Sequence, residues 1–285
     1  MIDSIKIIEC PRDAMQGIKS HFISTEAKAK YINSLLKVGF DTIDFGSFVS
    51  PKAIPQMRDT AEVLSKLDLS TTRSKLLAIV ANVRGANDAS QFEEINYLGY
   101  PFSISENFQM RNTHKTIAQS IDTLKEVLAI ANRTNKEVVA YLSMGFGNPY
   151  GDPWNVEIVG EWTEKLSKLG VKILSLSDTV GSSTPEDIDY LFSNLIQSYP
   201  QIEFGAHLHT TPAKWFEKVD SAFKAGCRRF DGAIKGYGGC PMAKDELTGN
   251  MPTEKLISYF TTQKIETNIK PMSFESAYNK ALDVF

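Results

Sequence analysis

The sequence predicts an α/β protein of the (β/α)8 class, a TIM barrel, with one additional helix at the C-terminus. Short runs rich in β-branched and aromatic residues alternate with amphipathic stretches whose apolar residues return every three or four positions. Eight such runs and about eight such stretches match the count of a closed (β/α)8 barrel. The length of 285 residues suits one barrel, which typically takes about 250 residues, so we predict a single domain over residues 1–285.

The predicted strands cover residues 5–10, 41–48, 75–81, 100–105, 137–146, 171–177, 202–209 and 228–236. The clearest helices cover residues 25–39, 61–67, 115–134, 156–170, 185–199 and 212–226, and residues 273–285 form the additional one. An open, doubly wound sheet shows the same alternation. However, the first strand leads into "CPRDAMQG", which lacks the glycine fingerprint of a dinucleotide-binding fold.

Composition excludes several classes of protein. Hydrophobic residues make up 42% of the chain and charged residues 23%, as in an ordinary globular protein. A net charge of −3 without a long basic stripe argues against nucleic acid as a partner. The sequence lacks a secretory signal and an apolar run of membrane-spanning length, so we expect a soluble, cytoplasmic protein without a membrane partner. The three scattered cysteines, Cys10, Cys227 and Cys240, predict free thiols.

Reactive side chains collect where the predicted strands end. In a barrel these ends share one mouth, and active sites of this fold are built there. We therefore expect a site at this mouth. Its candidate residues are Arg12 and Asp13 after the first strand, Asp44 and Ser47 on the second, Asp178 after the sixth, His207 and His209 on the seventh, and Cys240 and Asn250 after the eighth.

The segment "GAHLHTT" holds the clearest signal for a metal. His207 and His209 lie two residues apart on a predicted strand, so their side chains project to the same side. Two imidazoles facing the barrel interior can bind one ion, although hydrogen-bonded core histidines are an alternative interpretation. Their position at the end of the seventh strand, facing the "RD" after the first, favours the metal site.

Asp13 and Asn250 complete the predicted ligand set with a carboxylate and an amide oxygen. Two nitrogen and two oxygen ligands without a thiolate suit a six-coordinate divalent ion, Mg²⁺ or Mn²⁺, better than structural zinc. Two positions would remain for a substrate with adjacent hydroxyl and carbonyl oxygens. The ion would act on that hydroxyl as a Lewis acid and make it more acidic.

Arg12 and Cys240 are the predicted participants in the chemistry. Beside a metal, the guanidinium of Arg12 can stabilise developing negative charge, with Asp44 as its partner; a structural salt bridge is the alternative. Cys240 follows "GYGG", and a loop of such small residues can act as a lid that delivers a general acid. An inert cysteine in a flexible turn is the other interpretation.

Together these segments resemble one known family. "ECPRDAMQ", "IDFGSFVSPKAIPQM", "SLSDTVG", "AHLHTT", "GYGGCP" and "TGNMPTE" are similar, in this order, to blocks of the 3-hydroxy-3-methylglutaryl-CoA (HMG-CoA) lyase family of DRE-TIM metallolyases. The resemblance runs over nearly the whole chain. It implies a metal-dependent barrel that cleaves HMG-CoA into acetyl-CoA and acetoacetate, and by analogy a homodimer.

The resemblance also implies roles for individual residues. It makes Asp13, His207, His209 and Asn250 the metal ligands, and it assigns catalysis to Arg12, Asp13, Asp44 and Cys240. The residues expected to contact the substrate are Arg12, Gln16, Ser47 and Asp178.

Three departures from the family pattern concern the substrate. Asp44 stands where the family has a glutamate, so its contact with Arg12 is expected to need a water or a shifted backbone. The family's "RDGLQN" reads "RDAMQG" here, and the lid is longer and more charged, "GGCPMAKDELTGN". A 3-hydroxyacyl-CoA with another C3 substituent, or a 4-hydroxy-2-oxoacid without CoA, could fit such a lid. An aldolase or Claisen-type synthase of the same superfamily that acts on a 2-oxoacid is an alternative to the lyase. A barrel that only binds a ligand or partner is a further alternative.

Overall fold

The computed structural model describes residues 4–239 and 248–285, and it confirms the predicted (β/α)8 barrel. Eight strands pair in parallel, each with its neighbours in sequence, and β1 pairs with β8 to close the sheet. The eight strands are β1 Lys6–Glu9, β2 Thr42–Ser47, β3 Lys75–Ile79, β4 Ile95–Ser103, β5 Glu137–Ser143, β6 Ile173–Asp178, β7 Glu203–Thr210 and β8 Arg229–Gly232.

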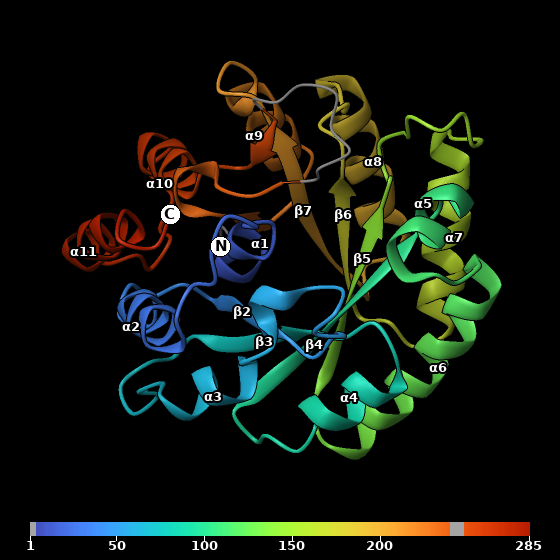
Figure 1. The fold of residues 1–285 in the computed structure, drawn as a ribbon. Coiled ribbons are helices and arrows are strands. Elements are labelled where there is room, and N and C mark those ends of the chain that lie inside the picture. The colour runs from blue at the N-terminus through green and yellow to red at the C-terminus, as the bar shows by residue number, and fades with distance from the viewer. Residues whose placement is uncertain (1–3, 240–247) are drawn as a thin grey trace.

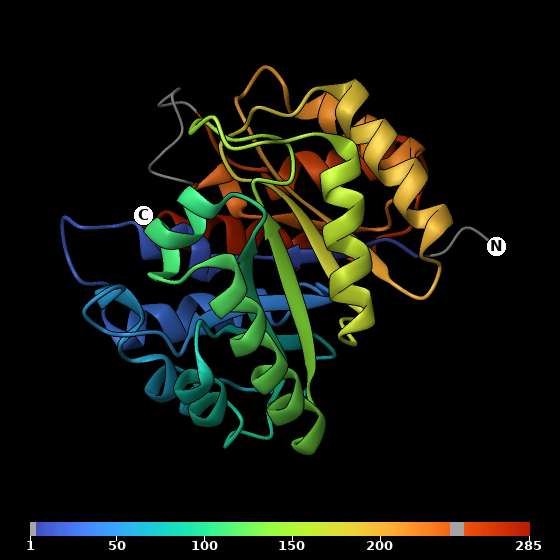
Figure 2. The same cartoon turned by 90° about the vertical axis from the view of Figure 1, so that its right-hand side faces the viewer.

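Helices surround this barrel (Figure 1), and turning it by 90° again places them outside the strands (Figure 2). They are α1 Pro11–Gln16, α2 Thr25–Leu35, α3 Thr60–Ser65, α4 Val83–Ala89, α5 Glu106–Thr113, α6 Ile117–Arg133, α7 Val156–Lys168, α8 Pro185–Ser198, α9 Trp215–Lys224, α10 Thr253–Thr262 and α11 Pro271–Ala281. The expected additional C-terminal helix is α11, which lies beside α2. Among the described residues, none of the helices combines the length and apolar character needed to cross a membrane.

Local sequence signals fix where several helices begin. Thr116 and Gln119 form a capping box at the start of α6, in which each side chain bonds the other residue's backbone N–H. Thr184 and Asp187 do the same for α8, where Pro185 takes the first helical position. These caps satisfy backbone groups that have no partner inside the helix, so they set the ends of the two helices without tertiary contacts.

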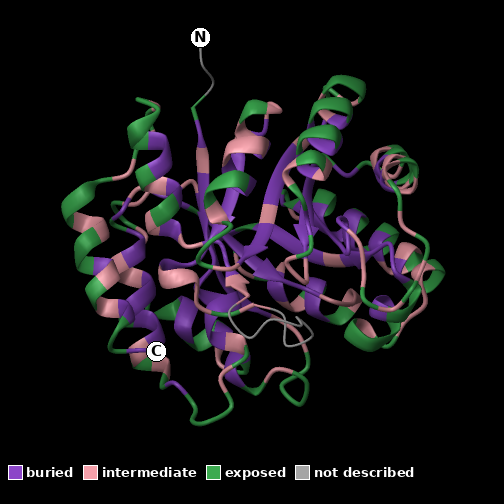
Figure 3. Ribbon diagram, turned by 90° about the horizontal axis from the view of Figure 1, so that it is seen from above, coloured by how far each residue is buried: buried purple, intermediate pink, exposed green. Residues whose placement is uncertain are grey.

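Apolar residues fill two regions. The larger core lies between the strands and the inward faces of the helices, and the strands are buried while the outer helix faces are exposed (Figure 3). A smaller cluster inside the barrel contains Leu77, Ile79, Tyr97, Val139, Tyr141 and Ile173 from β3 to β6. Ionic and imidazole side chains of the interior come from the other strands, as with Asp44, His207 and Asp231. These ionic and imidazole side chains therefore come from strands near the two ends of the chain.

Some elements differ from the sequence prediction. Strand β4 begins at Ile95, five residues before the predicted start. The prediction missed these residues because Asn96 and Gly99 interrupt the apolar pattern of the strand. A β-carbon at Gly99 would lie 2.5 Å from Ile79 Cδ1 inside the barrel, so a larger residue would force the side chains of the neighbouring strands to shift. Strand β8 ends at Gly232, and a short 3₁₀ turn, Ile234–Gly236, replaces the rest of its predicted length.

Candidate metal centre and active site

Arg12 and Asp13 belong to a helix that starts directly after β1. Pro11 takes the first position of α1, where its missing N–H and fixed φ are suited to a helix start. Arg12 and Asp13 therefore project from the first turn of α1, and both are buried. The sequence prediction placed them correctly at the barrel mouth but as strand-end residues.

The structure brings Asp13 and the two histidines of β7 together. Each of Asp13, His207 and His209 offers one ligand atom, and these three atoms lie within 4.8 Å of one another. The two imidazole rings are 5.3 Å apart between centroids, as their i, i+2 spacing on one side of β7 predicts. Three side chains of this kind and spacing could hold a single metal ion.

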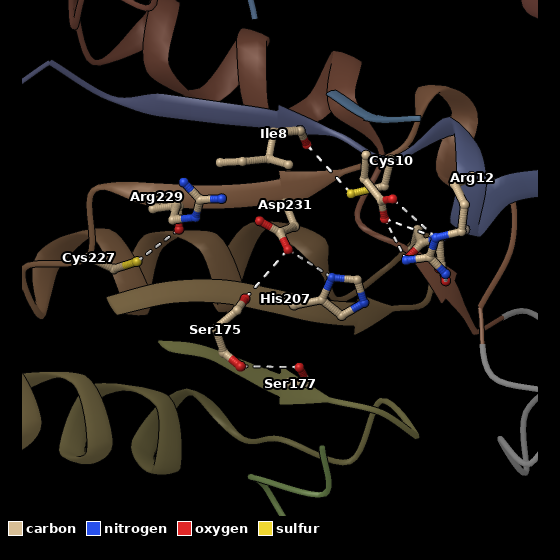
Figure 4. A network of polar contacts seen from close by, with 12 residues as sticks. Ile8, Cys10, Arg12, Ser175, Ser177, His207, Cys227, Arg229 and Asp231 are labelled. Atoms are coloured by element: carbon tan, nitrogen blue, oxygen red, sulfur yellow. Dashed lines mark hydrogen bonds and ion pairs between the residues drawn. The ribbon is translucent and has the colours of Figure 1, made fainter. Parts of the chain in front are cut away.

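Hydrogen bonds to the far ring nitrogens set the orientation of both imidazoles. Nδ1 of His209 lies 2.9 Å from the carbonyl oxygen of Thr179. A carbonyl can only accept, so Nδ1 carries the proton and Nε2 keeps its lone pair. Nδ1 of His207 is directed at Asp231 Oδ2 at 3.1 Å (Figure 4). This is how protein histidines that bind metals are usually held, with one nitrogen bonded to an acceptor and the other left for the ion.

An unpaired buried atom shows that this group of residues fits a metal. Among the described residues, Nε2 of His209 is buried without a hydrogen-bond partner. A buried polar nitrogen without a partner is costly, and a bound cation would supply the missing interaction. The donor set of two imidazole nitrogens and carboxylate oxygen is one that divalent ions accept.

Asn250 reaches the same place from the other end of the chain. It lies in a short strand, β9 Gly249–Asn250, which pairs antiparallel with the end of β7 so that Asn250 faces His209. Its Nδ2 donates to Asp13 Oδ2 at 2.8 Å and to the carbonyl of Tyr237 at 2.8 Å. The predicted meeting of residues from the first, seventh and eighth strand regions is present.

Charges around the cluster favour an ionised carboxylate and neutral imidazole. Burial would raise the pKa of Asp13, but the charges of Arg12, His207 and His209 lower it to about 2. Burial and the neighbouring His207 lower the pKa of His209 to about 4. At neutral pH, Asp13 is therefore an anion and His209 an uncharged base, the forms in which both bind metals.

Asp44 contacts Arg12 directly. Nε of Arg12 donates to both oxygens of Asp44 at 3.2 and 3.1 Å, Nη2 donates to Oδ2, and Nη1 donates to Asp13 Oδ1 at 2.9 Å. No water is needed to bridge Arg12 and Asp44. The pairing of β2 with β3 shifts register between Asp44 and Gly46. Burial raises the pKa of Asp44 to about 6, although Arg12 opposes this.

A cavity of about 430 Å³ opens beside the cluster. Arg12, Asp13 and both histidines line it, together with Gln16 and Ser47. Gln16 donates to Asp13 Oδ1 at 2.6 Å, and among the described residues Ser47 Oγ is buried without a hydrogen-bond partner. Both side chains therefore lie where a ligand in the cavity would meet them.

Among the described site residues that the sequence predicted, Asp44, Asn250 and Asp178 do not line this cavity. The carboxylate of Asp178 accepts bonds from the backbone N–H groups of Ser182 and Ser183 and from Lys218 Nζ. Asp178 thus lies behind the part of the cavity wall that its neighbour Thr179 forms. Cys240 lies outside the described residues.

Sequence reasoning missed the partners of the imidazoles. One of these partners, Asp231, was overlooked. It is a charged residue within the predicted strand 228–236 and lies two positions after Arg229, so the two side chains point to the same face of the strand. Two charged residues on one face of a barrel strand are a signal that could have revealed it. Thr179 acts through its backbone carbonyl, so its side chain carried no signal. Tyr141 packs edge-on against His207 with 5.5 Å between ring centroids and resembled an ordinary core aromatic in the sequence.

Comparisons with known proteins find relatives over nearly the whole chain. A family model described as HMGL-like matches residues 5–280. The chain is 34% identical over 260 residues to the hydroxymethylglutaryl-CoA lyase YngG of Bacillus subtilis, covering 91% of this chain and 86% of that protein. It is 31% identical to the human mitochondrial hydroxymethylglutaryl-CoA lyase, covering 96% and 84% of the two chains. A solved HMG-CoA lyase from Acinetobacter baumannii, in complex with coenzyme A and 3-methylmalate, superposes with a TM-score of 0.90 at 29% identity, covering 100% of this chain and 92% of the other.

Proposed function

This chain belongs to the HMGL-like family and is an HMG-CoA lyase-like enzyme, and from that premise we propose that it cleaves HMG-CoA, or a close 3-hydroxyacyl-CoA, into acetyl-CoA and acetoacetate or its analogue. The observation that carries the proposal is the cluster of Asp13, His207 and His209 beside Arg12 in one cavity. A set of metal ligands next to a fixed cation is what this cleavage needs, since one negative charge first develops on the C3 oxygen and then passes to the enolate oxygen of the departing fragment as the bond breaks.

The reaction can be balanced in terms of the substrate's own atoms. A base removes the proton of the C3 hydroxyl, the C2–C3 bond breaks, and C3 becomes the ketone carbon of acetoacetate. The electron pair of the broken bond passes to C2, which leaves as the enolate of acetyl-CoA and then takes up a proton. The protein must therefore bind an oxyanion at C3, stabilise an enolate oxygen and deliver one proton.

Arg12 is positioned for the enolate. Its guanidinium has five N–H groups, and three of them bond Asp44 and Asp13. The remaining two can donate to an oxygen in the cavity that Arg12 lines. Asp44 holds this guanidinium in place from behind, so the donor is oriented before substrate arrives.

We propose that Asp13, His207, His209 and Asn250 hold a divalent ion, Mg²⁺ or Mn²⁺. Such an ion, when bound, would act as a Lewis acid that acidifies the C3 hydroxyl. In the present geometry Asn250 turns its amide nitrogen toward Asp13, so ligation by its oxygen requires a rotation of the amide. Gln16 and Ser47 would bind substrate oxygens, and Asp178 would act from behind the cavity wall.

The acyl-CoA class of substrate has independent support. The relative from Acinetobacter baumannii was solved with coenzyme A, and it covers the whole of this chain. The proton-delivering role of Cys240 rests on the sequence alone. The cytoplasmic location and the homodimer likewise stay predictions, which cell fractionation and light scattering of the purified protein would test.

The decisive test is acetyl-CoA release from HMG-CoA with Mg²⁺ or Mn²⁺, before and after EDTA. We expect turnover that EDTA abolishes and added metal restores, and no turnover in His209→Ala or Asp13→Ala, because each removes a ligand. An aldolase or synthase would instead act on a 4-hydroxy-2-oxoacid or condense acetyl-CoA with a 2-oxoacid. A barrel that only binds would show affinity for the thioester by calorimetry without turnover, and either result would overturn the proposal.

A further inference from the structure

Lys218 on α9 is a lysine whose charge is wholly enclosed by the protein. Its side chain is 1% exposed, and its Nζ donates to Asp178 Oδ2 at 2.6 Å, to the carbonyl of His209 at 2.9 Å and to the carbonyl of Gly181 at 3.1 Å. An ammonium group has three N–H donors, so all three are used. They connect the end of β6, the turn after it and the end of β7.

Asp178 stabilises the same turn, residues 178–183, through hydrogen bonds to its backbone and side chains. Oδ1 accepts from the N–H of Ser182 at 2.8 Å, and Oδ2 accepts from the N–H of Ser183 at 3.2 Å and from its hydroxyl. Both oxygens of a buried carboxylate thus close residues 178–183 into a fixed loop. Lys218 neutralises this carboxylate and bonds the loop's own carbonyl at Gly181. The shape of the turn therefore depends on the buried ion pair.

This turn holds one of the imidazoles of the proposed metal centre. The carbonyl of Thr179, one residue after Asp178, accepts the Nδ1–H of His209 at 2.9 Å. The same ammonium that fixes the turn also bonds the backbone carbonyl of His209. Lys218 thus holds both the imidazole's acceptor and the backbone of the imidazole itself.

We propose that Lys218 is a positioning residue for the metal centre. By locking the turn 178–183 against β7, it keeps the Thr179 carbonyl in place, so that His209 stays in the Nδ1–H tautomer with Nε2 facing Asp13 and His207. This role deepens the proposed function and rests on it. It also gives Asp178 a task that needs no contact with substrate, namely to shape the turn that orients a metal ligand.

The chain supplies a matched control for a purely structural role. Lys28 is 2% exposed, and its Nζ bonds Asp59 Oδ1 at 2.7 Å and the carbonyl of Gln56. None of these three residues lines the cavity. Replacing either lysine by methionine leaves a buried carboxylate without its cation, which is strongly destabilising in both cases. Only the Lys218 variant disturbs the support of His209.

The first measurement uses the metal-free protein. The chain has four histidines, so ¹⁵N-histidine labelling gives few signals, and His209→Gln assigns those of His209. We expect the wild type and Lys28→Met to show the Nδ1–H tautomer of His209, and Lys218→Met to show a mixture of both tautomers. A second variant combines Lys218→Met with Asp178→Asn and so removes both charges of the buried pair. It replaces the single variant if that one does not fold, and we expect it to show the same mixture of His209 tautomers.

The second measurement is Mn²⁺ affinity by electron paramagnetic resonance. We expect about tenfold weaker binding in Lys218→Met and in the double variant, as for other residues that support a metal ligand, and wild-type binding in Lys28→Met. An unchanged tautomer together with unchanged affinity in the folded Lys218 variants would overturn the inference. A wild-type protein that binds no Mn²⁺ would overturn the proposed function instead, and the tautomer measurement would still decide the role of Lys218.

Discussion

Replacing Glu9 with glutamine should remove the contribution of this carboxyl to the pH dependence of the protein's stability between pH 4.5 and 8. Glu9 is fully buried, and burial raises the pKa of its carboxyl from the ordinary 4.5 to about 8. Its two oxygens accept bonds from the Thr253 hydroxyl at 2.6 Å and the Ile234 N–H at 2.9 Å. These two donors are not enough to keep the group ionised in the folded protein at pH 7.

The sign follows from comparing the folded and unfolded chains. Below pH 4.5 the carboxyl of Glu9 is protonated in both, so it does not disfavour folding. As the pH rises toward 8, the unfolded chain loses this proton while the folded chain keeps it, so the free energy of unfolding falls. Each pH unit in this window costs about 1.4 kcal/mol, which gives about 3 kcal/mol at pH 7. Glutamine has the same shape and no ionisation, so it avoids this cost.

Urea unfolding followed by circular dichroism at pH 4.5, 5, 6, 7 and 8 tests this value. We expect the free energy of unfolding of Glu9→Gln, minus that of the wild type, to rise with pH over this range. At pH 7 this difference should be about 3 kcal/mol larger than at pH 4.5. Glu126→Gln, at an exposed position of α6, is the control and should follow the wild type. A constant difference between Glu9→Gln and the wild type at pH 5 and pH 8 would refute the reasoning.

Three other changes test the site. In Gly238→Ala, the new β-carbon would lie 2.7 Å from the carbonyl of Asp13 at a φ of +84°, so we expect weaker Mn²⁺ binding by calorimetry and a lower melting temperature; wild-type affinity would contradict the geometry. Asp231→Asn replaces the charged acceptor of His207, so Mn²⁺ affinity should fall about tenfold, and an unchanged affinity would show that this contact does not support the ligand. Cys240→Ser should slow acetyl-CoA release without changing Mn²⁺ affinity; an unchanged rate would remove the thiol from the reaction.

The sequence was sufficient for the barrel and for the cluster around His207 and His209, because both follow from simple periodicities. Alternation of strand and helix patterns defines the fold, and a spacing of two on a strand places both imidazoles on one side. Pattern alone could not show that Arg12 and Asp13 sit on a helix, since α1 has only six residues and its start depends on Pro11.

Residues that act through others left no recognisable pattern. Lys218 lies on an amphipathic helix, where a lysine ordinarily faces water. Its burial depends on a carboxylate forty residues earlier in the sequence, and no local signal reports that contact. The pairing of β9 with β7 escaped detection for the same reason, because a strand of two residues carries no periodicity.

The bond between Asn250 and Asp13 joins residues 237 positions apart. An ion coordinated by both would act as a reversible cross-link between the two ends of the polypeptide, and because only the folded barrel brings these ligands together, its binding would stabilise the folded state. Chelators should therefore affect how fast the barrel opens as well as what it catalyses, and saturating metal should slow the separation of the first segment from the last.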